Sequence, residues 1–238
     1  MPQSIIALIT PRTADIGGFQ VRRALPSVER RSVGPFVFWD EMGPGSFAPR
    51  SGLDVRPHPH IGLATATYLF EGGILHRDSL GTVLEIEPGD LNWMTAGRGI
   101  VHSERTGPER RAAGHRLHGI QAWVGLPRAL ELGEPGFVHH AGSELPAWEE
   151  EGGRLRLVAG TAAGRRSPVA VASPALFLHA ELDAGAVFVL DDEHPERAVY
   201  VVAGGLELGG TAVGAGTMAV LAPGVTVELR ATTPTRAV

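Results

Sequence analysis

The chain has 238 residues, a formal net charge of −5 at pH 7 and no cysteine. The acidic balance argues against a protein that grips nucleic acid through its phosphates, and the lack of cysteine excludes disulfides and thiolate ligands. No apolar stretch approaches the roughly 20 residues that span a bilayer, and the pattern of the first residues does not lead us to expect secretion. We therefore expect a cytoplasmic protein that makes no membrane or direct nucleic-acid contact.

Short apolar runs separated by turns rich in glycine and proline predict an all-β fold with antiparallel strands. In the first half the expected strands are residues 4–9, 18–25, 35–40, 63–70, 74–78, 82–86, 91–94, 100–104 and 118–124. In the second half they are residues 155–160, 175–182, 186–190, 198–202, 205–208, 218–221 and 225–229. The two series predict two β-barrels, at residues 1–126 and 151–238. A linker at 127–150 joins them, and the pattern around residues 126–134 allows a short helix.

Two short stretches of the first half carry the chemistry, Arg56-Pro-His-Pro-His60 and Val101-His-Ser-Glu104. Residues two apart on a β-strand point to the same face of the sheet, so each stretch presents two candidate ligands on one side. The prolines hold the residues before them in extended geometry, and they restrict this segment to an edge or a bulge of its sheet. We expect the two stretches to be neighbouring strands.

Three imidazoles and one carboxylate suit a divalent first-row metal, and iron is the leading candidate if positions remain open for substrate or oxygen. Nickel, copper, manganese, cobalt and zinc are also compatible with these ligands. The predicted metal ligands are His58, His60, His102 and Glu104. Glu104 also has a predicted catalytic role, because a carboxylate at the metal accepts a proton from a bound hydroxyl. The alternative for Glu104 is a surface ion pair with Arg98 or Arg105.

Other polar residues of this half give weaker signals. His76 lies beside Asp78 on a predicted strand, where an exposed position and a functional one are equally compatible with the pattern. We expect His118 and Gln121 to supply contacts around the metal ligands. The bulky side chains that we assign to the core are Phe38, Trp39, Trp93 and Met94.

The first half resembles a cupin barrel, because His58, His60, Gly72, Gly89 and His102 fit the places of the cupin motifs. It departs from them at Thr65, which takes the usual glutamate position. The fourth ligand of the cupin pattern is therefore expected at Glu104 instead. A fourth ligand at this place resembles the pattern of the pirin family of bicupins. The stretches that carry this resemblance are Asp15-Ile-Gly-Gly-Phe-Gln-Val-Arg-Arg23, Tyr68-Leu-Phe-Glu-Gly72, Asn92-Trp-Met-Thr-Ala-Gly-Arg-Gly-Ile-Val-His-Ser-Glu104 and His118-Gly-Ile-Gln121.

The resemblance implies a mononuclear Fe(II) held by His58, His60, His102 and Glu104, and a metal-free second barrel. It also implies the quercetin 2,3-dioxygenase activity of some pirins, with a planar aromatic substrate and oxygen as partners. In that reaction Glu104 helps to remove the flavonol proton, and carbon monoxide and a depside ester are released. The alternative function is an iron-dependent regulatory module that binds a protein partner without turnover. A metal-dependent isomerase is a third function that the same ligands allow. We expect a monomer.

Overall fold

The structure is a computed structural model that describes residues 4–16, 18–150 and 152–238. Gly17 of the first pirin-like stretch, and residues 1 and 151 that bound the two expected domains, lie outside the described residues. Strands make up 58% of the chain and helix 3%, which confirms the all-β prediction. No helix in the described ranges is long and apolar enough to cross a membrane.

The chain divides into two compact units. The metal-site unit comprises Arg12–Arg23 and Phe36–Ser143. The C-terminal unit comprises Met1–Pro11, Ala24–Pro35 and Glu144–Val238. The units therefore differ from the consecutive ranges expected from the sequence, because two N-terminal segments belong with the second half of the chain.

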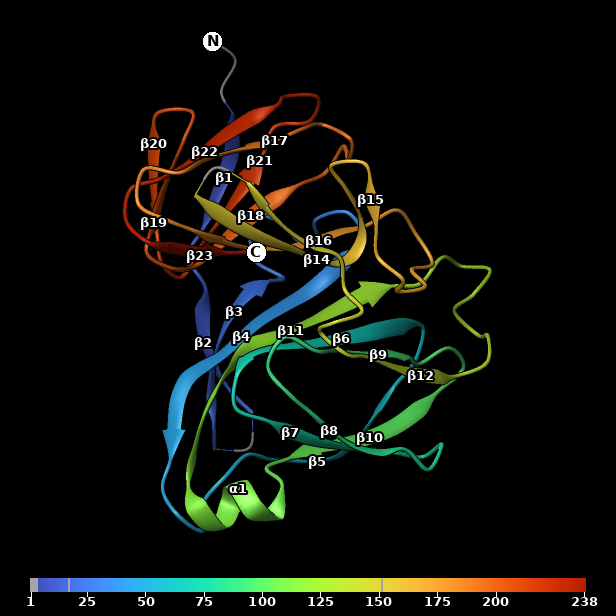
Figure 1. Ribbon diagram of the computed structural model, residues 1–238. Helices are drawn as coiled ribbons and strands as arrows, with labels where there is room; N and C mark the ends of the chain where they lie inside the picture. The colour runs from blue at the N-terminus through green and yellow to red at the C-terminus, as the bar shows by residue number, and fades with distance from the viewer. Residues whose placement is uncertain (1–3, 17, 151) are drawn as a thin grey trace. The chain divides into compact units, whose positions relative to one another are not determined.

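The metal-site unit consists of two antiparallel sheets, drawn as two layers in Figure 1. The larger sheet has the order β12 (Gly136–His140), β9 (Leu91–Thr95), β6 (Leu63–Glu71), β11 (His115–Gly125), β4 (Phe36–Phe47), β3 (Gln20–Leu25) and β2 (Arg12–Asp15). The smaller sheet has the order β5 (Asp54–His60), β10 (Ile100–Arg105), β7 (Ile74–Asp78) and β8 (Val83–Ile86). A short helix, α1 (Pro108–Ala113), connects β10 to β11.

The core of this unit lies between its two sheets. Its buried members are Val21, Met42, Leu53, Leu69, Ile74, Ile86 and Leu117. These residues alternate along their strands with residues that face away, as expected for sheets that bury one face. The sheets are open within the described residues, so the predicted barrel is a β-sandwich of the cupin kind.

The C-terminal unit is also built from two antiparallel sheets. The larger one has the order β1 (Ile5–Ile9), β21 (Thr217–Leu221), β18 (Ala198–Ala203), β23 (Thr235–Ala237), β16 (Leu176–Leu182), β14 (Gly153–Ala162) and β13 (Ala147–Glu150), and β15 (Arg165–Arg166) pairs with β14. The smaller one has the order β17 (Val187–Leu190), β22 (Val227–Ala231), β19 (Gly205–Leu208) and β20 (Thr211–Gly214). A continuous apolar core that includes Leu155, Val201, Leu208 and Leu229 fills this unit.

The expected linker contributes strands to both units, since β12 pairs with β9 and β13 pairs with β14. The helix considered for residues 126–134 is absent there. Leu130 donates its backbone N–H to the Pro127 carbonyl, and Gly133 donates to Leu130. Hydrogen bonds between residues three apart define successive turns, and Pro135 prevents their extension into a helix.

A buried histidine makes the C-terminal unit sensitive to acid. His179 on β16 is 14% exposed at its side chain, and burial is the main cause that lowers its pKa to about 4. Arg236 acts in the same direction, whereas Glu181 opposes it. The unfolded chain takes up a proton at this residue near pH 6.5, while the folded chain does so only near pH 4. Folded-state stability is therefore lost as the pH falls through this window.

We expect His179→Gln to remove up to about 3 kcal/mol of the stability difference between pH 7 and pH 4. Urea denaturation at both pH values measures this difference. His140→Gln, at a partly buried histidine of the metal-site unit, is the matched control. An unchanged pH dependence in His179→Gln would contradict the assignment.

Candidate metal centre

The two histidine-bearing strands are direct neighbours, as the sequence predicts. β5 and β10 pair antiparallel, with His58 opposite His102 and His60 opposite Ile100. Directly opposed residues of an antiparallel pair point to the same face. The three imidazoles therefore meet on the inner face of the smaller sheet.

Backbone chemistry explains why β5 lies at the edge of this sheet. Pro57 and Pro59 have no N–H group to donate to a second neighbouring strand, so the strand pairs only with β10. The pairing register shifts between His102 and Glu104. Both the edge position and the irregularity confirm what the prolines predict.

The ring nitrogens of His58, His60 and His102 lie within 4.8 Å of one another, and together they form a group that could hold a metal ion. The Nε2 atoms of His60 and His102 are 3.0 Å apart. The three ring centroids are separated by 4.5–5.0 Å. Nitrogen atoms this close to one another can coordinate a single metal ion.

Burial favours the neutral form of two of these rings. It is the main cause that lowers the pKa of His60 to about 4; the neighbouring His102 and His58 contribute to this shift, while Glu104 opposes it. Burial likewise lowers the pKa of His102 to about 3, with His58 and His76 acting in the same direction. Both rings are therefore neutral at pH 7, and neutral imidazole is the form that binds metals.

The remaining ring nitrogens fit metal binding as well. The Nδ1 atom of His58 lies 2.9 Å from the Arg56 carbonyl oxygen, so it is the donor, and its Nε2 lone pair is available to a metal. The Nδ1 atom of His102 is buried and has no hydrogen-bond partner in the described residues. Three imidazole ligands suit zinc, copper, iron or nickel.

Glu104 is buried beside this group, at 5% exposure, but its carboxylate is outside the set of mutually close ligand atoms. Gln121 Nε2 donates to both carboxylate oxygens, at 2.9 and 2.8 Å. The Thr67 hydroxyl donates to Oε1 at 3.3 Å. The structure thus excludes the surface ion pair considered from the sequence, and it fixes the orientation of the carboxylate.

An aromatic wall adjoins the histidines on the inner face of the larger sheet. Trp123 is partly exposed and lies edge-on to His60, with ring centroids 5.1 Å apart. Phe38 stacks on Trp123 at 4.0 Å, and the Arg23 guanidinium covers the Phe38 ring at 4.3 Å. Arg23 is itself held by two hydrogen bonds to Asp40. These contacts hold the flat wall rigidly beside the candidate metal centre.

Of the two residues expected to contact the metal ligands, one does so and the other does not. Gln121 contacts Glu104, which confirms that prediction. The prediction for His118 is wrong, because its Nε2 atom lies 2.8 Å from Glu41 on the opposite face of the larger sheet. Residues three apart on a strand face opposite sides, and β11 also has a register shift between His118 and Gly119.

The core predictions for the bulky residues are confirmed. Phe38, Trp39, Trp93 and Met94 are all buried. The structure also settles the position of His76, which is 3% exposed and lies inside the metal-site unit. Arg77 is exposed between the buried side chains of His76 and Asp78, and this alternation of a charged residue with its neighbours along β7 is the signal that the sequence offers for this position.

Two sandwiches of the cupin kind, one with a three-histidine group on its inner face, define a bicupin with a candidate metal centre. The Pirin family model matches residues 18–124, and the model of the pirin C-terminal cupin domain matches residues 177–238. The chain belongs to the pirin family.

Named relatives are similar over most of the chain. A "Pirin-like protein" of Caulobacter vibrioides is 51% identical over 92% of this chain and 77% of its own length. A "Putative quercetin 2,3-dioxygenase" of Pseudomonas aeruginosa is 43% identical over 87% of this chain and 65% of its own length, slightly less than two thirds. The crystal structure of a quercetin 2,3-dioxygenase from Acinetobacter baumannii superposes with a TM-score of 0.90 at 32% identity, covering 98% of this chain and 77% of that one.

Proposed function

We propose that this protein is a mononuclear metal-dependent dioxygenase that cleaves quercetin or a similar flavonol and releases carbon monoxide. The proposed ligands are His58, His60, His102 and Glu104, and Fe(II) is the proposed metal. The observation that carries the proposal is the group of three close imidazoles, two of them buried, beside an oriented carboxylate. The relatives named as quercetin dioxygenases support the same substrate class.

When bound, Fe(II) supplies Lewis acidity toward the substrate hydroxyl and the redox chemistry that a reaction with oxygen requires. Glu104 accepts the proton of the flavonol 3-hydroxyl at a carboxylate oxygen. Gln121 holds that carboxylate in place, so little reorganisation is needed when the proton moves. Removal of the proton makes the flavonol ring electron-rich and ready for oxidation.

The aromatic wall binds and orients the substrate. Trp123 is partly exposed and lies next to His60, and a flat aromatic ring packs favourably against an indole. Phe38 fills the space behind Trp123 and prevents it from turning away. The wall therefore selects planar aromatic compounds over flexible aliphatic ones.

The test is the release of carbon monoxide from quercetin and oxygen by protein reconstituted anaerobically with Fe(II). We expect release well above a His60→Ala blank, measured as trapped carbon monoxide together with oxygen uptake. Parallel samples loaded with nickel, copper, manganese, cobalt or zinc identify the most active metal. Absence of release with iron demonstrably bound would contradict the proposal and favour a regulatory module that binds a protein partner.

A further inference from the structure

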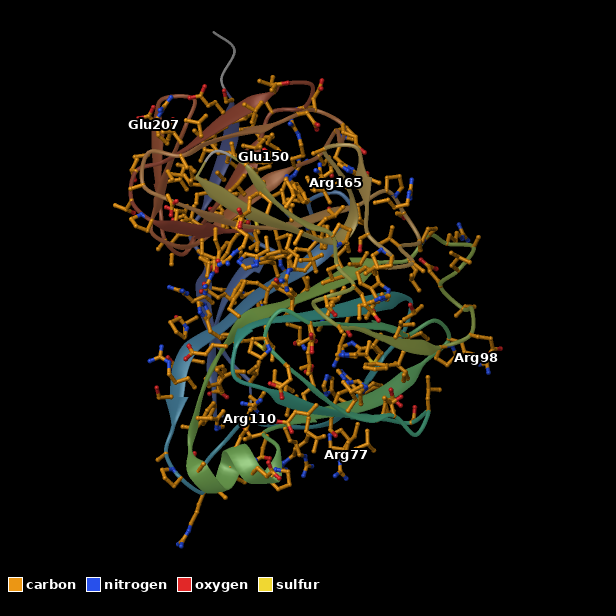
Figure 2. All side chains as sticks on the ribbon, in the orientation of Figure 1. Arg77, Arg98, Arg110, Glu150, Arg165 and Glu207 are labelled. Carbon is orange, nitrogen blue, oxygen red and sulfur yellow. The ribbon has the colours of Figure 1, made fainter. Side chains whose placement is uncertain are left out.

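A second histidine–carboxylate pair lies inside the metal-site unit, outside the proposed ligand set. His76 Nε2 and Asp78 Oδ2 on β7 are 2.9 Å apart. The side chains are 3% and 0% exposed, so the pair is almost completely removed from water. Arg77 between them points away from the sheet (Figure 2), which leaves both neighbours directed inward.

Asp78 is held firmly by the turn that follows β7. Its Oδ1 atom accepts the backbone N–H groups of Leu80 at 2.9 Å and Thr82 at 3.1 Å. With the His76 contact, both carboxylate oxygens have donors. A buried carboxylate with this many donors remains ionised and keeps one orientation.

The strand register places this pair directly beside the proposed metal ligands. On the pairing of β10 with β7, Asp78 lies opposite His102, and His76 lies opposite Glu104. The rings of His76 and His102 are 5.3 Å apart. His76 also stacks on Phe137 at 4.4 Å, which fixes its ring from the other side.

A carboxylate lies on the strand next to His102, although it makes no hydrogen bond to that ring. Its Nε2 atom faces His60, and its buried Nδ1 atom has no hydrogen-bond partner in the described residues. A metal-bound histidine is usually supported by a carboxylate or carbonyl that stabilises the positive charge on its ring. Asp78 is the ionised group directly across the strand pair from His102.

We infer that Asp78, held in place by His76, is a positioning residue that strengthens metal binding through His102. The inference rests on the proposed metal ligands, although not on the identity of the substrate. Asp78 places a fixed negative charge beside the ligand group, and a divalent cation is stabilised by such a charge in a buried environment. The buried pair of His76 and Asp78 thus has a role in metal binding, in addition to its contribution to packing.

Cobalt(II) binding to the purified metal-free protein tests this role without any substrate. Asp78→Asn keeps the size of the side chain and removes its charge. We expect it to weaken cobalt affinity by about 10- to 100-fold in competition with a chelator, and to shift the visible absorption of bound cobalt. Glu85→Gln, on β8 of the same sheet and 32% exposed in a pair with Arg110, is the matched control and is expected to bind cobalt normally.

Wild-type affinity and an unchanged cobalt spectrum in Asp78→Asn would overturn the inference, even if its thermal stability were lower. His76→Gln provides a second test if Asp78→Asn does not fold, and we expect a loss of at least about threefold in affinity. Unchanged affinity in that variant would equally overturn the inference. Failure of the wild-type protein to bind cobalt would overturn the metal site itself, whereas cobalt binding without carbon monoxide release would contradict only the proposed reaction.

Discussion

His60→Ala is expected to lose most of the bound metal and all carbon monoxide release. The ring lies at the centre of the ligand group, 3.0 Å from His102 Nε2 and close to His58. A four-ligand site contributes on the order of 10 kcal/mol of binding free energy, so the loss of one ligand lowers affinity by at least about 100-fold. Metal content after gel filtration, measured by elemental analysis, gives the result directly.

The matched control for this variant is His115→Ala. His115 lies in the same unit, bonds to the Thr106 hydroxyl at 3.1 Å and is outside the ligand group. We expect it to retain stoichiometric metal. Full metal content in His60→Ala would refute the ligand assignment, and equal losses in both variants would indicate general destabilisation instead.

The local features of the site could be predicted because they follow from short stretches of sequence. The prolines at 57 and 59 restrict their strand to an edge, and the spacing of two between His58 and His60 places both rings on one face. The pairing of β5 with β10 was also predictable, since the two histidine stretches require a common partner. Periodicity and proline chemistry act within a few residues, so one sequence is enough to read them.

Features that depend on distant residues were not predictable in this way. The apolar strand β1 fits any sheet that offers a free edge, and its pairing with β21 depends on residues more than 200 positions away. Helix α1 has no buried residue, so it leaves no apolar periodicity to detect. The burial of His76 depends on Phe137 from β12, which the sequence assigned to a linker.

The arrangement of Glu104 shows how a small irregularity affects function. The spacing from His102 predicts that both side chains share a face, and both are indeed buried. The register shift between them places Glu104 opposite Val55 and within reach of Gln121. The carboxylate is therefore held by an amide beside the histidine group, and a role in proton transfer requires this fixed orientation.

Glu104→Gln is consequently expected to lower kcat by about 100- to 10,000-fold while KM for quercetin changes little. Glutamine has nearly the same shape and keeps an oxygen for the metal and for Gln121, but it cannot accept the substrate proton. Steady-state kinetics on iron-loaded protein, normalised to iron content, separates this effect from weaker metal binding. The appropriate control is Glu41→Gln, which removes another fully buried carboxylate of the same unit, on the opposite face of the sheet.

The comparison of the two glutamate variants decides between chemistry and structure. Loss of turnover in Glu104→Gln alone, with iron retained, would assign proton removal to this carboxylate. Loss of turnover in both variants would indicate that the removal of either buried carboxylate destabilises the unit, and the effect would then not be specific to proton removal. Unchanged turnover in iron-loaded Glu104→Gln would leave the three histidines as the essential ligands, and the proton would then have to leave the flavonol by a route that does not involve Glu104.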